Sequence, residues 1–145
     1  MNQHIMNEFK EYIYLAAEMD AVYHEAARKA GISDSVMRIL YTLAAFGDEC
    51  TQSNVCYLTG ISRQTINSAI RKLEREGIVY LGTDSRKNKP IRLTEKGKTL
   101  AEEKVVPVLE AEKEMFSSWD EKERQELMRL TKKYLDQLKE QMRRI

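Results

Sequence analysis

Residues 51–77, TQSNVCYLTGISRQTINSAIRKLEREG, constrain the fold most, because they hold two short helical patterns separated by a single glycine turn. Thr51 and Ser62 are residue types that cap helix N-termini. Gly60 and Gly77 follow the two patterns at the points where helices end. A turn this short makes the two helices share one small core. The stretch therefore predicts a helix-turn-helix.

The helical period assigns an inner face to each of these helices. Val55 and Leu58 are expected to face inward from the first helix, and the small Cys56 permits a close approach. The inner face of the second helix consists of Ile66, Ala69, Ile70 and Leu73. The opposite faces are left for solvent or for a partner.

The outer face of the second helix has side chains that suit a DNA duplex. Counting about 100° per residue from Ile66, the outward positions are Gln64, Asn67, Ser68, Arg71 and Arg75, with Arg63 at the exposed first turn. Gln and Asn can bond N6 and N7 of adenine, Arg reaches guanine or phosphate, and a helix N-terminus favours a phosphate. Two packed helices with polar exteriors are the alternative, but this face has almost no carboxylate before Glu74. Which of the three uncharged residues reads a base stays open.

Charge is concentrated in the middle of a chain that is nearly neutral, with 24 Lys+Arg and 23 Asp+Glu. Residues 1–59 have 4 cations and 8 anions, residues 60–98 have 10 and 4, and residues 99–145 have 10 and 11. The central basic segment raises the local potential and attracts polyanions such as nucleic acid. An ordinary solvated face is the other interpretation of the charge alone.

Two short runs after the second helix predict a hairpin. IVYLG at 78–82 and PIRLT at 90–94 contain β-branched and aromatic residues and are joined by a polar loop with three cations. A helix-turn-helix followed directly by a basic hairpin is a winged helix. The expected fold is therefore mainly α with a small β-hairpin wing, and the winged helix-turn-helix occupies residues 33–94 of a single domain, residues 1–145.

Further helices are expected on both sides of this part. Apolar residues recur from Ile5 to Ala27 at three- and four-residue steps, and Gly31 ends that helix. Ser33 can cap a second helix, whose apolar positions are Val36, Ile39, Leu40, Leu43 and Phe46.

After the hairpin, Thr94 can cap a long helix that Pro107 should kink or restart. Asp120 and Glu123 form a capping-box pattern for a last helix. The apolar stripe of that helix is Leu127, Leu130, Tyr134, Leu138, Met142 and Ile145.

The stretch Asp84-Ser85-Arg86 and the following Ile91-Arg92-Leu93-Thr94-Glu95-Lys96-Gly97 resemble the D-x-R wing and the "LTEKG" segment of the multiple antibiotic resistance regulator (MarR) family. The helix-turn-helix and the order of elements are similar too, so the resemblance covers nearly the whole chain. It implies a bacterial transcription regulator, more often a repressor because occluding a promoter needs only tight binding. The N-terminus lacks a continuous apolar stretch, so we expect the protein to be cytoplasmic. The wing tip SRKNKP has unusual cations and Cys56 replaces a common alanine, so the resemblance implies no particular operator sequence.

The resemblance also implies roles for individual residues. Ser62 to Arg71 would form the recognition helix, Thr51 to Ser53 would touch the DNA backbone, and Arg86 would enter the minor groove with Asp84 orienting it. The DNA-binding residues predicted in this way are Thr51, Gln52, Ser53, Ser62, Arg63, Gln64, Thr65, Asn67, Ser68, Arg71, Asp84, Arg86, Lys87 and Lys89.

The terminal helices, residues 1–30 and 95–145, are expected to form a homodimer. The stripes at 5–27 and 127–145 fit poorly into a compact core of residues 33–94, so they need another partner. Packing against each other within one chain is the alternative. A two-fold dimer presents two recognition helices to a pseudo-palindromic operator, with half-sites about 10–10.5 bp apart or a multiple of this.

Ligand and redox roles rest on fewer residues. Tyr12, Tyr14, Met19, Tyr23 and Met37 either line an effector cavity, of the kind the family often has for small aromatic anions, or form ordinary core. Redox sensing by Cys50 or Cys56 is not favoured, because the family's peroxide sensors carry their cysteine near the start of the first helix and residues 1–49 contain none.

Other classes of protein fit the sequence poorly. No metal spacing joins the two cysteines to His4 and His24, and we expect neither metal nor cofactor. No signal peptide and no run of about 18 apolar residues is present, so no membrane role is expected. There is no nucleophile with a convergent base, hence no expected enzyme activity. A winged helix that binds a protein instead of DNA stays open, and apolar residues on the outer face of residues 63–75 would favour it.

Overall fold

The computed structural model describes residues 2–47, 49–83 and 88–145. It contains two compact units, Met1–Leu109 and Glu110–Ile145. The elements in chain order are α1 (Gln3–Ala30), α2 (Asp34–Phe46), α3 (Gln52–Thr59), α4 (Arg63–Arg75), β1 (Val79–Leu81), β2 (Ile91–Leu93), α5 (Glu95–Lys104), α6 (Val106–Ser118) and α7 (Glu121–Met142). The predicted fold class, helices with a small hairpin wing, is confirmed.

Short polar side chains start the helices as the sequence predicts. Five N-cap side chains each accept a hydrogen bond from the backbone N–H three residues later; they are Ser33, Thr51, Ser62, Thr94 and Asp120. Each bond satisfies one of the amides that a helix start leaves without an intrahelical partner. Local capping bonds thus determine the residues at which α2, α3, α4, α5 and α7 begin.

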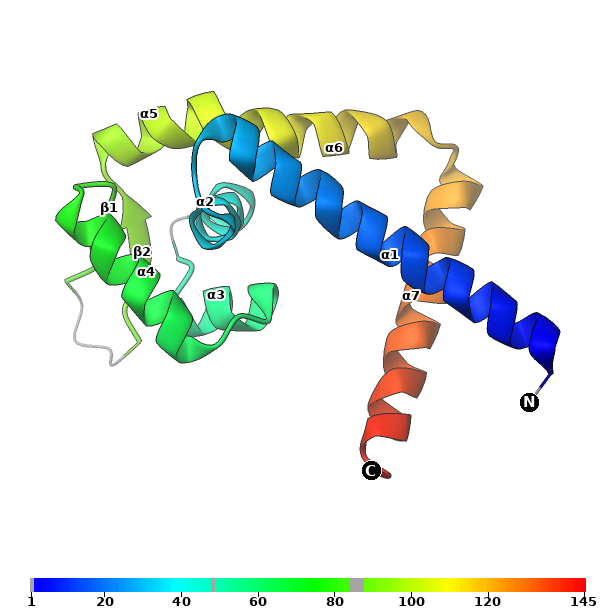
Figure 1. Ribbon diagram of the computed structural model, residues 1–145. Helices are drawn as coiled ribbons and strands as arrows, with labels where there is room; N and C mark the ends of the chain where they lie inside the picture. Colours follow the sequence, from blue (N-terminus) through cyan, green and yellow to red (C-terminus); the bar gives the residue numbers. More distant parts are fainter. Residues whose placement is uncertain (1, 48, 84–87) are drawn as a thin grey trace. The chain divides into compact units, whose positions relative to one another are not determined.

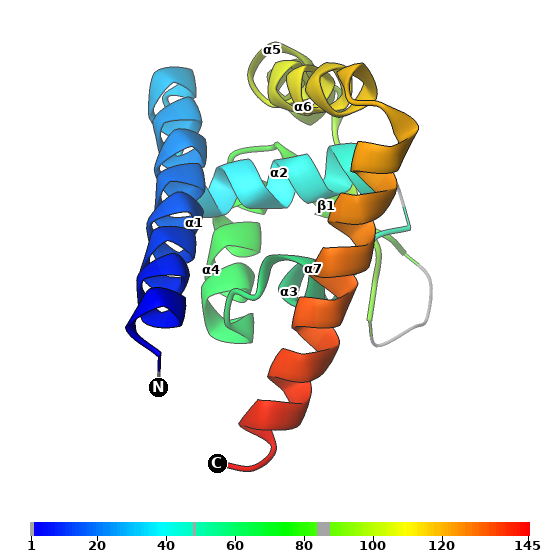
Figure 2. The ribbon, with the colours of Figure 1, turned by 90° about the vertical axis from the view of Figure 1, so that its right-hand side faces the viewer.

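The core of the first unit surrounds α2, which contacts α1, α3, α4, α5 and β2. Figure 2 shows α2 running between α5 on one side and α3 and α4 on the other. Its Ile39 and Leu40 are completely buried, and Val55, Ile66 and Ile91 bring α3, α4 and β2 to the same cluster. Because α2 packs against five other elements, it supports the helix-turn-helix.

Leu58, which the sequence assigns to an inner face, is exposed, and so is Phe46, one of the apolar positions of α2. Leu58 is 42% exposed, because the inner face of the short α3 is occupied by Val55 and Thr59, one turn apart. The Thr59 hydroxyl can be buried since it donates to the Val55 carbonyl at 2.7 Å. Phe46 is 62% exposed, because the last turn of α2 extends beyond the core and its neighbours Ala45 and Gly47 are exposed as well.

The wing begins as the predicted antiparallel hairpin (Figure 1). Its register pairs Val79 with Leu93, Tyr80 with Arg92 and Leu81 with Ile91. An isolated bridge between Thr51 and Pro90 adds the chain segment before α3 to the edge of this sheet.

Of the two alternatives for Pro107, the restart is observed. α5 ends at Lys104 and α6 begins at Val106, so Pro107 lies in a first helical turn, where its missing N–H costs no hydrogen bond.

The second unit contains the end of α6 and all of α7. The rings of Phe116 and Trp119 are 6.1 Å apart, and the Arg124 guanidinium donates to the Trp119 carbonyl. α7 starts at a capping box of Asp120 and Glu123 and has no buried residue.

None of the described helices combines the length and the apolarity that a membrane crossing requires.

Candidate nucleic-acid interface

α4 separates apolar and polar side chains onto opposite faces. Ile66, Ile70 and Leu73 are 0–1% exposed and anchor the helix to the core. The exposed residues of α4 are Arg63, Gln64, Thr65, Ser68, Arg71, Lys72, Glu74 and Arg75, and none of them is apolar. Asn67 is half-buried, at the edge of this face. The predicted outer face therefore exists as a continuous polar, cation-rich surface.

The N-terminal turns of α3 and α4 are joined to each other. The Ser62 hydroxyl accepts from the Thr65 amide at 3.2 Å and caps α4. The Arg63 guanidinium donates to the Ser53 hydroxyl at 2.6 Å, across from α4 to α3. Two predicted DNA-binding residues from different helices thus lie side by side.

Thr51 caps α3, as the sequence predicts, and also forms a reciprocal pair with Asn54. Its hydroxyl accepts from the Asn54 amide at 3.2 Å, and the Asn54 side-chain oxygen accepts from the Thr51 amide at 2.9 Å and from the Thr51 hydroxyl at 2.8 Å. Asn54 therefore completes a capping box, which sequence reasoning missed because Glu or Gln is the usual partner at this position. Gln52 and Ser53 are half-buried in the same turn.

Arg38 of α2 holds the turn between α3 and α4. Its guanidinium donates to the Thr59 carbonyl at 2.5 Å, one of the carbonyls that the end of α3 leaves without a helical partner. Gly60 follows with a φ of 68°, a left-handed conformation that glycine adopts without strain. Arg38 is 21 positions away from Thr59, so no local sequence pattern could reveal this contact.

The base of the wing is attached to the chain segment before α3. The Ile91 amide donates to the Cys50 carbonyl at 2.8 Å, and the Gly82 amide donates to the Pro90 carbonyl at 2.8 Å. A Cβ on Gly82 would be 2.7 Å from the Pro90 side chain, so glycine is needed for this approach. The wing and the N-terminus of α3 are therefore held together.

Two cations of the wing region are described. Lys89 is exposed at the hairpin. Arg92 lies 3.4 Å from the carboxylate of Glu49, which partly neutralises it. The predicted wing-tip residues Asp84, Arg86 and Lys87 lie outside the described residues.

The candidate effector residues differ in exposure. Tyr12, Tyr14, Met19 and Tyr23 are 46–71% exposed along α1, whereas Met37 is 7% exposed and belongs to the core of the first unit. Met37 is thus ordinary core, which is the second of the two interpretations left open by the sequence.

The cysteines and histidines form no metal-binding group among the described residues. Both cysteines are free thiols, and burial raises the pKa of the Cys50 thiol above its ordinary value. A raised pKa keeps the thiol protonated at neutral pH, which lowers its reactivity. The His4 Nε2 atom lies 3.2 Å from a carboxylate oxygen of Glu8, and the His24 Nδ1 atom lies 2.7 Å from one of Asp34. Nowhere in the described part of the chain do three or more His, Cys, Asp or Glu residues form a group that could hold a metal ion.

The packed helix-turn-helix and the hairpin attached to it define the class of protein as a winged helix-turn-helix protein. The family model described as the MarR family matches residues 30–88, from the end of α1 into the wing. No match was found among the curated protein sequences.

Solved structures extend the likeness to the remaining helices. A MarR/EmrR family regulator from Acinetobacter sp. ADP1 has a TM-score of 0.69 at 22% identity and covers 97% of this chain and 99% of its own. The S. aureus MepR–DNA complex has a TM-score of 0.66 at 23% identity, covering 89% and 96%. A MarR transcriptional regulator from Methanosarcina mazei Go1 has a TM-score of 0.59 at 26% identity, covering 96% and 93%. The predicted resemblance to the MarR family is confirmed, and the chain has the fold of MarR-family transcription regulators.

Proposed function

We propose that this chain binds double-stranded DNA sequence-specifically, as a homodimeric transcription regulator that represses by occluding a promoter. The observation that carries the proposal is the outer face of α4. Side chains able to read bases or contact phosphates cover it, with Gln64, Ser68 and Arg71 all exposed. The only carboxylate among its exposed residues, Glu74, lies near the C-terminal end.

The same face argues against a protein partner. A docking surface for a protein is expected to have an apolar centre, and none of the exposed residues of α4 is apolar. The MepR structure described as a DNA complex shares the fold of this chain. We therefore favour a duplex over a protein as the partner of α4, which we call the recognition helix from here on.

The α1 and α7 stripes support a homodimer. Ile5, Phe9 and Ile13 of α1 are 48–55% exposed, and Leu127, Leu130 and Leu138 of α7 are 40–46% exposed. A long apolar stripe on a helix normally faces a partner, and a second copy of the chain supplies matching stripes by symmetry. Two linked recognition helices would bind two half-sites of a pseudo-palindromic operator.

The remaining predicted contacts extend this surface. Thr51, Gln52 and Ser53 at the start of α3 and Ser62, Arg63 and Thr65 at the start of α4 would contact phosphates, because helix N-termini present free amides. Lys89 and the wing-tip cations would contact the neighbouring groove. A small aromatic or anionic effector that releases the DNA remains a prediction from the family resemblance.

Arg71→Ala tests this function against a control that is matched in charge. A duplex selected by the wild-type protein from a random-sequence library serves as the probe, and binding is measured by fluorescence anisotropy over a salt series. Arg71→Ala should weaken binding and, if the guanidinium contacts phosphate, lower the salt slope by about 0.9. Arg129→Ala, which removes a cation that pairs with Glu126 on α7, should do neither. Failure of the wild-type protein to select any sequence, or equal effects of the two variants, would refute the proposal.

A further inference from the structure

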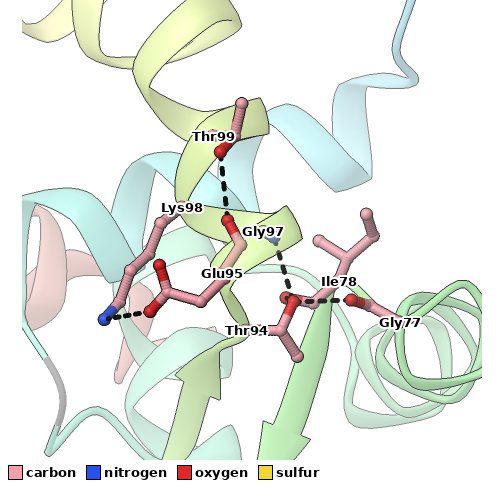
Figure 3. Close-up of polar contacts among 7 residues, drawn as sticks. All are labelled: Gly77, Ile78, Thr94, Glu95, Gly97, Lys98 and Thr99. Atoms are coloured by element: carbon pink, nitrogen blue, oxygen red, sulfur yellow. Dashed lines mark hydrogen bonds and ion pairs between the residues drawn. The ribbon is translucent and has the colours of Figure 1, made fainter.

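The segment Thr94–Gly97 contacts the end of the recognition helix (Figure 3). The Thr94 hydroxyl donates to the Gly77 carbonyl at 2.5 Å, with the Ile78 carbonyl 3.2 Å away. The Thr94 amide donates to the Ile78 carbonyl at 3.0 Å. The Lys96 ammonium group donates to the Glu76 carbonyl at 2.8 Å. Three consecutive carbonyls behind the recognition helix are therefore bound by the start of α5.

The Thr94 oxygen has a second partner, which makes it a junction of two helix ends. It accepts from the Gly97 amide at 3.0 Å and is the N-cap of α5. One side-chain atom thus caps the N-terminus of α5 and binds the carbonyl that follows the C-terminus of α4. Any movement of one helix end away from the other breaks a hydrogen bond at this atom.

Gly97 makes this close approach possible. A Cβ at this position would lie 2.0 Å from the Ile78 carbonyl oxygen and 3.0 Å from its carbon, both of them backbone atoms. No side chain fits without separating α5 from the chain behind the recognition helix. Gly97 is also buried, so the contact is closed to solvent on that side.

These contacts are independent of the bonds that end the recognition helix itself. The Gly77 amide donates to the Glu74 carbonyl and the Ile78 amide donates to the Leu73 carbonyl, at 3.0 and 2.9 Å. The helix therefore terminates without help from α5. The additional bonds from Thr94 and Lys96 fix its direction relative to α5, which leads along the chain into α6 and α7.

We propose that Thr94 is a positioning residue for DNA recognition. Together with Lys96 and Gly97 it locks the recognition helix to α5 and thereby sets the half-site spacing that the dimer accepts. The inference rests on the proposed DNA-binding function. It goes further by assigning the spacing to a contact that lies behind the recognition helix, on residues that are not among the predicted DNA-binding residues.

The test compares Thr94→Val, Thr94→Ser and Thr99→Val. Valine keeps the shape of threonine without the hydroxyl, and serine keeps the hydroxyl. Thr99 is the matched control, because its hydroxyl donates only within α5, to the Glu95 carbonyl at 3.1 Å (Figure 3). Each protein is titrated with the duplex selected by the wild-type protein, with versions whose half-sites are one base pair closer or farther apart, and with a random duplex.

Thr94→Val should bind the selected duplex at least fivefold more weakly, and the ratio of affinities between correct and altered spacing should fall at least threefold. Its affinity for random duplex should change less than twofold. Thr94→Ser and Thr99→Val should stay within twofold of wild type in all measurements. Unchanged spacing ratios in a folded Thr94→Val protein would overturn the inference, even with weaker binding, because a merely structural residue lowers affinity without changing spacing preference.

A second pair of variants decides the question if Thr94→Val does not fold. Lys96→Met and Lys98→Met each remove one cation from the same turn, but among the described residues Lys98 pairs with Glu95 of its own helix, at 3.4 Å. The ratio of affinities between correct and altered spacing should fall for Lys96→Met and not for Lys98→Met. The same ratio in both variants would overturn the inference. A wild-type protein that selects no duplex is a different failure, since it refutes the proposed function before any variant is compared.

Discussion

Shortening two leucines of α7 tests the dimer most directly. Leu130 and Leu138 are 46% and 40% exposed in the single chain and lie two turns apart on the apolar stripe. We consider the double variant Leu130→Ala/Leu138→Ala. Alanine favours the helix, so α7 itself should persist while the apolar surface offered to the partner becomes smaller.

The size of the effect follows from the exposed fractions. Complete burial of a leucine side chain contributes about 1.5–3 kcal/mol, so the exposed 40–46% corresponds to ~0.6–1.4 kcal/mol for each side chain. A two-fold dimer contains four altered side chains. The free energy of dimerisation should therefore fall by ~3–5 kcal/mol, which is about a 100- to 4,000-fold increase in the dimer dissociation constant.

Sedimentation equilibrium over a concentration series measures that constant, and far-UV circular dichroism checks that the helices remain. Lys132→Ala is the control, because Lys132 is exposed on the opposite face of α7, where it pairs with Asp136. A double variant whose dimer constant stays within tenfold of wild type would refute the assignment of the stripe to the interface. So would an equal loss in Lys132→Ala.

Three further outcomes are expected. Gln64→Ala should weaken binding to the selected duplex and spare random duplex, because an uncharged side chain releases no counterions; equal losses would show that it reads no base. From the sequence of the wing tip, Arg86→Ala should cost about 1.5–3 kcal/mol of binding and reduce the salt slope, Asp84→Ala should cost less, and unchanged binding by Arg86→Ala would contradict this. In thiol titration of the native protein, Cys50 should react at least about tenfold more slowly than Cys56, because it is buried and its pKa is raised; equal rates before denaturation would contradict this.

Local chemistry made much of the fold predictable. Capping side chains such as Ser33 and Ser62 act within three residues, and the apolar period of residues 63–75 identifies the buried face directly. Leu58 was wrongly assigned to an inner face because an apolar stripe gives a direction but not the extent of the core, and the exposed Phe46 shows the same limit at the end of α2. A helix end can extend beyond the residues that cover its middle.

Contacts between distant residues were beyond such reasoning. Arg38 belongs to no motif in the sequence, and only the three-dimensional arrangement places its guanidinium on the carbonyl at the end of α3. The Arg63–Ser53 bond likewise depends on the crossing of α3 and α4. These contacts hold the candidate surface in place, although neither residue pair forms a motif along the chain.

The segment Leu93–Gly97 shows how a sequence resemblance acquires a physical reason. In the sequence, Thr94 has a local explanation as a helix cap and Gly97 has none, because a glycine in the first turn of a helix weakens it. The structure explains both residues at once, since the Gly97 amide and the Gly77 carbonyl share the Thr94 hydroxyl and only glycine leaves room for the Ile78 carbonyl. Replacing Thr94 would remove the acceptor of the Gly97 amide, and replacing Gly97 would push α5 away from the Ile78 backbone. The helical propensity lost at Gly97 is therefore offset by a contact that no single helix can provide, between the end of the recognition helix and the start of α5.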